Sequence, residues 1–105
     1  MKQDDQRIIK LARILADPLR FQALNLIKQG RDDDCQTPIN PEHPMSLCPT
    51  DLSHKMGIKK TKLDYHLKVM VDNNIISKYV HGIHTYYAPN LQGLQPLEKW
   101  ISNYK

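Results

Sequence analysis

The sequence predicts a mainly α-helical domain with one small β-hairpin. Apolar residues recur at helical spacing in five segments, and two short β-prone runs joined by a glycine turn precede the last of these segments. The chain has 105 residues, of which 40% are hydrophobic and 25% are charged, a balance typical of a globular chain. This length is enough for one domain, so we expect residues 1–105 to fold as a single unit.

Two helices are predicted at the start of the chain. Residues 4–16 carry apolar residues at helical spacing, with basic residues between them. Asp17 and Pro18 end this helix and begin a second one over 18–29, because Asp accepts backbone N–H bonds at an N-cap and the N–H that proline lacks would be unpaired there anyway. Gly30 then provides a left-handed stop.

A long loop separates these helices from the next pair. Residues 31–48 contain an acidic triplet and three prolines, and a loop of this length in a compact domain is expected to be functional or mobile. A short helix over 49–56 follows, with Cys48 at its N-cap and Pro49 at its first helical position. Gly57 ends this helix.

The next helix is predicted over 60–73. Its apolar stripe consists of Leu63, Leu67, Met70 and Val71, and its other faces are polar and basic. Two short helices joined by a tight glycine turn, the second one basic on its outer side, are typical of a helix-turn-helix. In that motif the second helix enters the major groove of DNA.

A hairpin and a last helix complete the prediction. The runs IISKYV and TYYA flank the glycine turn HGIH, which predicts a β-hairpin over 75–88 that Pro89 stops. A hairpin directly after a helix-turn-helix is a wing. A short, aromatic-rich helix is predicted over 95–104, with Pro96 near its start. The expected fold is therefore a winged helix-turn-helix.

The charges are distributed unevenly along the chain. One arginine faces five acidic residues between positions 31 and 51, whereas five lysines face one aspartate between positions 55 and 68. Such a basic segment attracts a polyanion, although a solvated helix face is the simpler alternative. Lys donates to guanine, Thr contacts the thymine methyl and Asp accepts from cytosine. We expect DNA contacts from this helix and from the wing: Lys59, Lys60, Thr61, Lys62, Asp64, Tyr65, Lys68, Lys78, His81 and His84.

Four fragments resemble the bacterial ArsR-type (arsenic-repressor-like) regulators: LADPLRFQALNLI, DLSHKMGIKKTKLDYHLKVM, NNIISKYVHGIHTYYAPN and GLQPLEKWI. They cover nearly the whole chain apart from residues 31–47, and their order and spacing together are specific. The resemblance implies a homodimeric winged helix-turn-helix repressor that often senses a small ligand or metal. The loop at 31–47 is longer than in the family, and Lys59 stands where Ser or Thr usually caps the recognition helix. His66 is expected to pack and hydrogen-bond rather than to bind a ligand.

The resemblance also implies dimerisation through the first and last helices. The last helix carries more apolar surface than a short terminal helix leaves in water. A homodimer would bind a palindromic operator. The residues expected at its interface are Leu11, Leu97, Trp100, Ile101 and Tyr104.

The metal-sensing site of the ArsR-type regulators has two cysteines in the run L-C-x-C-D-L. Here the corresponding run keeps Cys48 but has Thr50 at the second position, so a soft-metal site is incomplete. We therefore expect no metal or cofactor. The alternative is zinc or another soft metal, for which the candidate ligands are Cys35, His43, Cys48 and His54. The same two thiols offer a redox response as a further alternative.

Other classes of function lack their sequence signatures. No nucleophile elbow, P-loop, dinucleotide fingerprint or H-E-x-x-H is present, so we do not expect an enzyme. No apolar run approaches the ~18 residues that span a membrane, and we expect a cytoplasmic protein with no membrane partner. The expected function is sequence-specific binding of double-stranded DNA by a homodimeric repressor. The alternatives are a metal- or thiol-responsive repressor that uses Cys48 with Cys35, and a winged-helix protein-interaction module that binds no DNA.

Overall fold

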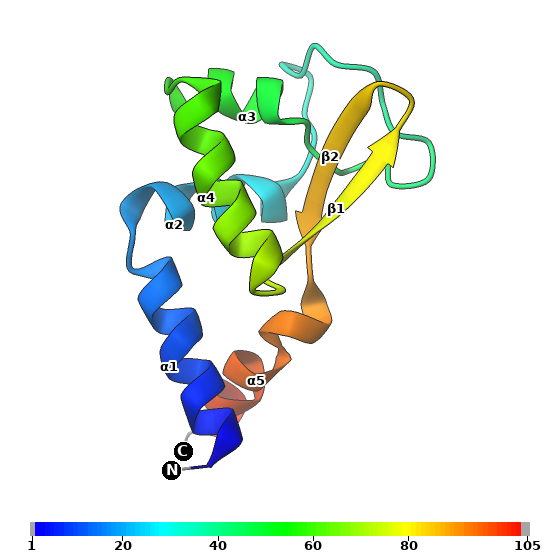
Figure 1. Cartoon of the computed structure of the whole chain (residues 1–105). Helices are drawn as coiled ribbons and strands as arrows, with labels where there is room; N and C mark the ends of the chain where they lie inside the picture. Colours follow the sequence, from blue (N-terminus) through cyan, green and yellow to red (C-terminus); the bar gives the residue numbers. More distant parts are fainter. Residues whose placement is uncertain (1, 104–105) are drawn as a thin grey trace.

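The computed structural model describes residues 2–103 and confirms the winged helix-turn-helix (Figure 1). Two helices precede the loop, two follow it, and an antiparallel hairpin leads into the last helix. In chain order the elements are α1 (Gln3–Leu15), α2 (Pro18–Gln29), α3 (Pro49–Met56), α4 (Lys60–Asp72), β1 (Ile76–His81), β2 (His84–Pro89) and α5 (Leu91–Ser102).

The core lies between α2, α3, α4 and the base of the hairpin, and it also includes Leu11 and Ile14 of α1. In the apolar stripe of α4, Leu63 and Met70 are fully inaccessible and Leu67 almost so, as predicted, whereas Val71 is only half-buried. From the hairpin, Tyr86 is also fully buried. α1 and α5 extend away from this body side by side, so that both termini lie at the end opposite the wing tip (Figure 1). No described helix is long and apolar enough to cross a bilayer.

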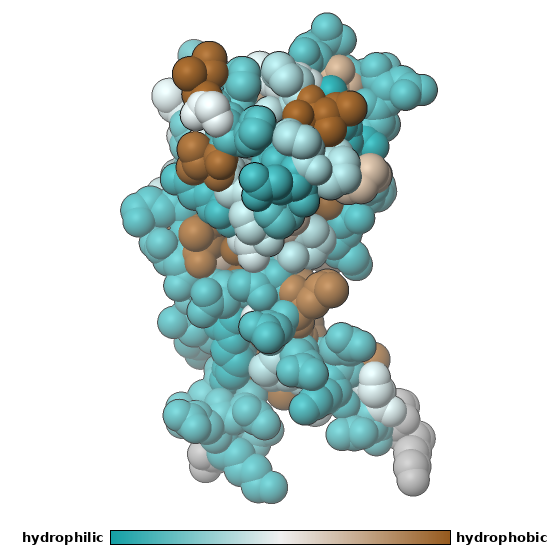
Figure 2. All heavy atoms as spheres, turned by 90° about the vertical axis from the view of Figure 1, so that its right-hand side faces the viewer, coloured by the Kyte–Doolittle hydropathy of each residue, from teal (hydrophilic) through white to brown (hydrophobic). Residues whose placement is uncertain are grey.

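The face shown in Figure 2 is mostly hydrophilic, with separate hydrophobic patches near the end of the molecule that carries the wing and around its middle. Among the described residues, ten large apolar side chains are more than a third exposed. Three of them matter below: Ile83 at the wing tip, which is 95% exposed, and Trp100 and Ile101 on α5, each 60% exposed.

The helix ends follow the sequence signals, except at the N-cap of α3. Asp17 caps α2 by accepting from the backbone N–H groups of Leu19 and Arg20 at 2.8 and 3.3 Å. Gly57 closes α3 in the left-handed conformation, with φ +65°. Cys48 and Lys59 occupy the N-cap positions of α3 and α4, but neither side chain makes a capping hydrogen bond. The weak cap that Lys59 predicts is therefore present, and α4 still begins at Lys60 because its apolar stripe packs into the core.

The long loop is fixed to the body at several points rather than hanging free. Leu47 pairs with Tyr87 of β2 through two backbone hydrogen bonds of 2.9 and 2.8 Å, which form an isolated antiparallel β-bridge between the loop and the hairpin. The hydroxyl of Tyr86 donates to the carbonyl of Pro38 at 2.7 Å. The ring of His43 stacks on Tyr79 of β1 with centroids 3.5 Å apart. The loop thus lies against the wing along much of its length.

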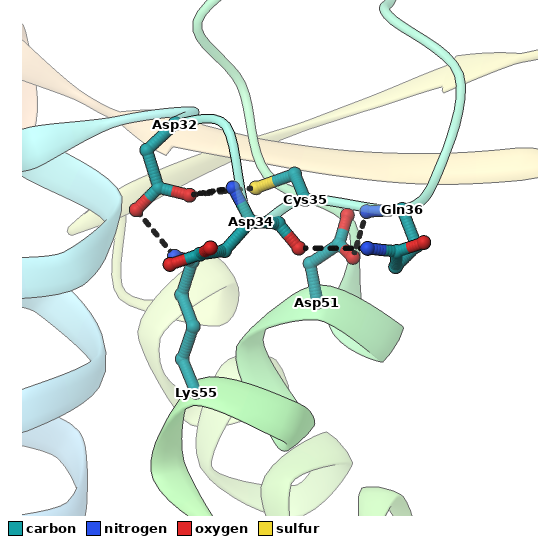
Figure 3. Close-up of polar contacts among 6 residues, drawn as sticks. All are labelled: Asp32, Asp34, Cys35, Gln36, Asp51 and Lys55. Carbon is teal, nitrogen blue, oxygen red and sulfur yellow. Dashed lines mark hydrogen bonds and ion pairs between the residues drawn. The ribbon is translucent and has the colours of Figure 1, made fainter.

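A buried carboxylate at the start of α3 holds the loop from below (Figure 3). Asp51 accepts from the backbone N–H of Gln36 at 2.9 Å, and from both the backbone N–H and the hydroxyl of Thr37. Burial raises the pKa of Asp51, but these hydrogen bonds outweigh it and leave the pKa below its usual value. One turn later, Lys55 binds Asp32 at 2.5 Å.

Several boundaries differ from the prediction. The first helix lies one residue earlier than 4–16, and α4 ends one residue before 73. The last helix begins at Leu91 rather than at 95, because the side chain of Asn90 caps it by accepting from the N–H of Gly93 at 3.0 Å. Pro96 therefore lies inside the helix and not near its start. The wing begins and ends one residue later than predicted, and Pro89 is the last residue of β2, paired with Ile76.

Candidate nucleic-acid interface

The exposed face of α4 carries every DNA-contact residue predicted on that helix. Packing against the body buries Leu63, His66, Leu67 and Met70, which lie on one side of the helix. The remaining positions face outward because the helical period places them on the opposite side. Those predicted to contact DNA are all exposed: Lys60, Thr61, Lys62, Asp64, Tyr65 and Lys68, together with Lys59 at the N-cap.

An open groove of about 540 Å³ runs between α4 and the wing. It is lined by Lys60 and Lys68 from α4 and by Lys78 and His84 from the wing, so residues far apart in the sequence meet here. The start of α3 forms a further part of the lining. Asp64 also lines the groove, whereas the other predicted residues are exposed but lie outside it: Lys59, Thr61, Lys62, Tyr65 and His81.

Ion pairs leave most of the basic charge of this face available. Among residues 2–103 the two ion pairs are Lys55 with Asp32 and Lys68 with Asp72, the latter at 2.9 Å between two exposed side chains. The hydrogen bond from Lys55 holds the pKa of Asp32 below its usual value and raises the pKa of Lys55 in return. Lys55 is thus paired with a carboxylate of the loop, and Lys68 would have to break its ion pair with Asp72 to bind a phosphate.

His66 positions α4 instead of contacting a ligand. Its side chain is buried, and its Nδ1 lies 3.3 Å from a terminal nitrogen of Arg20. A guanidinium group only donates, so Nδ1 accepts in this pair. Arg20 also donates from Nε to the carbonyl of Ile14 at 2.7 Å. This chain of contacts connects α1, α2 and α4, as expected for a packing histidine.

The wing presents both polar and apolar groups. Lys78 and His81 on β1 are exposed, whereas His84 is half-buried and its ring packs edge-on against Tyr86. The sequence analysis missed the most exposed apolar side chain of the described residues, Ile83. Its position beside Gly82 in the turn was the signal, because a residue at the tip of a short hairpin cannot reach the core.

The structure does not assemble the alternative metal site. Within residues 2–103, no three His, Cys, Asp or Glu side chains gather into a group that could hold a metal ion. Cys35 contacts Asp32 at 3.7 Å, His43 stacks on a tyrosine, and His54 is exposed on α3. Cys48 is a buried free thiol that lines the groove.

The residues predicted at the dimer interface fall into different environments. Leu11 is a correction: it is fully buried in the core of its own chain and has no surface to offer a second copy. Leu97 is half-buried against the same core. Trp100 and Ile101 are well exposed on α5, as predicted, and Tyr104 lies outside the described residues.

Comparison with known proteins places this geometry in context. No protein-family model matches the chain. The arsenical resistance operon repressor of Bacillus subtilis is 40% identical over 43 residues, which is 41% of this chain and 41% of that repressor. The transcriptional repressor SdpR of the same species is 24% identical over 90 residues, covering 86% of this chain and 83% of SdpR. The chain thus matches less than half of the first relative and most of the second.

Solved structures show the same fold. One is the homodimeric winged helix-turn-helix DNA-binding domain of a possible ArsR-family regulator from Mycobacterium bovis. It superposes with a TM-score of 0.64 at 16% identity, covering 94% of this chain and 75% of that domain. The predicted fold is therefore confirmed: the chain is a winged helix-turn-helix protein, and its similarity to ArsR-type regulators agrees with the resemblance seen in the sequence.

Proposed function

We propose that the protein is a homodimeric transcriptional repressor that binds a palindromic DNA operator through α4 and the wing. The observation that carries this proposal is the groove in which Lys60, Lys68 and Lys78 from two separate elements line one face. A major groove about 12 Å wide admits a helix such as α4, and its flanking phosphates would meet these lysines. The two curated relatives are both repressors, which supports the direction of regulation.

The exposed apolar residues of α5 support the dimer. Trp100 and Ile101 lie on a helix that packs beside α1, far from the DNA-contact face (Figure 1). Burying them against a second copy would leave both α4 helices free for DNA. The solved Mycobacterium bovis domain is described as homodimeric, which agrees with this arrangement. A repressor of this kind works where the chromosome lies, so we place the protein in the cytoplasm.

The test is selection of DNA by the purified full chain. Duplexes with a random 30-base-pair centre are incubated with the protein, recovered and sequenced, and binding to the recovered duplex is measured by fluorescence anisotropy at several salt concentrations. We expect a palindromic consensus, and an affinity that falls steeply with salt because phosphate contacts release counterions. Sedimentation should give a dimer at about 10 μM, a concentration at which even a micromolar interface is mostly formed.

Two results would contradict the proposal. A protein-interaction module would recover no consensus and would bind duplexes weakly, without a steep dependence on salt. A monomer in both sedimentation and DNA binding would exclude the palindromic arrangement, because each half-site would then be bound independently. Replacing Trp100 with Ser should produce such a monomer, and replacing the exposed Phe21 of α2 with Ser is the matched control.

A further inference from the structure

Ile83 occupies a position that the fold leaves fully in water. The hairpin closes with His81 paired to His84, so its turn consists of Gly82 and Ile83 alone. Gly82 has φ +60°, whereas Ile83 is not among the positive-φ residues, which is the pattern of a type II′ turn. Ile83 is 95% exposed, and Val80 on the adjoining strand is 70% exposed. Nothing in the turn geometry requires an isoleucine at this position.

The tip nevertheless faces the surface that carries the basic charge. Ile83 lines the same groove as Lys60 and Lys68 of α4 and Lys78 of β1, and Asp64 and Asp72 also line it. Figure 1 shows that the tip and the start of α4 lie at the same end of the molecule. An apolar residue therefore lines the same groove as the lysines that would bind phosphates.

We propose that Ile83 is an apolar wedge that enters the minor groove of DNA next to the major groove occupied by α4. This inference rests on the proposed function and adds a specificity-determining residue to it. With α4 in the major groove, the neighbouring sugar–phosphate strand would run along the lysine-lined groove between α4 and the wing. The wing tip then arrives on the far side of that strand, which is the adjacent minor groove.

The size and chemistry of the tip fit this site. The minor groove is about 6 Å wide, which admits one aliphatic side chain but no helix. Isoleucine is among the apolar residues that proteins insert between base steps from this groove. The floor of the groove at G·C pairs carries the guanine N2 amino group, which would obstruct such a side chain, whereas A·T pairs carry none. Ile83 should therefore select A·T pairs beside each half-site.

The charges around the tip favour DNA over an apolar protein partner. The polar side chains on the two strand ends that flank Ile83 are His81 and His84, with Lys78 three residues before His81, and no carboxylate lies on the hairpin itself. A protein partner would have to pair or desolvate these groups, while a phosphate backbone complements them.

The experiment compares Ile83→Ser with wild type on the duplex recovered by selection from the random pool. The matched control is Ile39→Ser, which removes an isoleucine that is 56% exposed on the loop. We expect Ile83→Ser to lower affinity about tenfold, which corresponds to ~1.4 kcal/mol. The salt dependence should not change, because no charge is removed. Because the side chain is in water, the thermal midpoint of the variant should equal that of wild type.

Modified bases test the contacts in the minor groove separately from all other contacts with DNA. Replacing adenine by 2,6-diaminopurine in the flanking A·T pairs adds an amino group to the minor groove and leaves the major-groove face unchanged. We expect this replacement to weaken binding by wild type and by Ile39→Ser, and to leave Ile83→Ser unaffected.

Two outcomes overturn the wedge while leaving the proposed function standing. One is an Ile83→Ser variant that binds DNA with the affinity of wild type. This result would overturn the wedge even if the variant no longer bound some protein partner. The other is equal sensitivity of wild type and Ile83→Ser to diaminopurine. If wild type itself binds no duplex in a salt-dependent manner, the proposed function fails and the wedge fails with it.

Discussion

Replacing Lys60 and Lys62 together with Ala tests the DNA-contact face through its charge. Both side chains are exposed in the first turn of α4, and the ion pairs of the described residues involve neither of them. If each binds a phosphate, each contact contributes ~0.9 to the slope of log affinity against log salt. A dimer carries four such lysines, so the double variant should lower the slope by about 3.6.

This change in slope corresponds to a large difference in salt sensitivity. Raising the salt from 50 to 200 mM should weaken wild type about 150-fold more than the double variant, a factor that follows from the slope alone. The assay is fluorescence anisotropy on the selected duplex and on an unrelated duplex. Phosphate contacts predict weaker binding to both duplexes, whereas a lysine that reads guanine predicts loss on the selected duplex only.

The matched control is Lys28→Ala, which removes an exposed lysine from the end of α2, outside the groove. It should leave the slope unchanged. Lys68→Ala should have a smaller effect than either lysine of the first turn, because Lys68 is paired with Asp72 in the free protein. Unchanged affinity and slope in the double variant would refute both the phosphate and the guanine roles.

Three further predictions concern the scaffold and the buried thiol. Gly93→Ala should destabilise the fold by about 2–3 kcal/mol in denaturant unfolding, because an added Cβ would lie 1.5 Å from the carbonyl oxygen of Asn74. Asp51→Asn should cost about 2 kcal/mol at neutral pH, since the carboxylate accepts three hydrogen bonds, two of them from Thr37. Its lowered pKa means that wild type holds this stability above the unfolded-state pKa of ~3.9 and loses it as the pH falls through the folded pKa, which thermal midpoints against pH would measure. Cys48→Ser should bind DNA as wild type does, and zinc, arsenite and peroxide should affect both proteins alike in the anisotropy assay.

The first two of these predictions have control substitutions at neighbouring exposed residues, which distinguish the expected effect from a general effect of mutation. Gln92→Ala, an exposed neighbour on α5, should leave stability unchanged, and Asp33→Asn on the exposed part of the loop should not alter the pH profile. A stable Gly93→Ala protein would show that α5 can move away from the end of α4 at little cost. Loss of DNA on metal or oxidant addition in wild type but not in Cys48→Ser would establish a sensor thiol.

The sequence predicted the helices well where apolar spacing and end signals agreed. Asp17, Pro18 and Gly30 determined α2, and the stripe of α4 predicted both its burial and its exposed basic face. The start of α5 was misplaced because Pro96, read locally, indicates the first turn of a helix. Only the tertiary structure shows why a glycine is required at position 93, since the backbone of Asn74 lies against it.

The loop and Leu11 show which features of the structure the spacing of residues in the sequence does not predict. Acidic residues and prolines predicted a segment that could be mobile, yet Asp51 lies outside that segment and holds it through Thr37. Such a contact between distant residues leaves no periodic signal in the sequence. Leu11 was assigned to the dimer interface from the family resemblance, and its complete burial within the chain identifies it as a core residue.

One side chain connects α1 and α5 to α4. Arg7 of α1 donates to the carbonyl of Asn73, at the end of α4, and to the carbonyl of Gly93 in α5 at 3.1 Å. The close approach of Gly93 to Asn74 makes this joint stiff, because the two backbones are in contact. In a dimer formed through α1 and α5, the distance between the two α4 helices would therefore be set by a short, rigid connection on each side. Half-sites of a palindrome lie one helical turn apart, about 34–36 Å. Such a joint would hold the two α4 helices at that spacing. Changes at Arg7 should therefore let the dimer bind half-sites at other spacings before they lower the affinity for a single half-site.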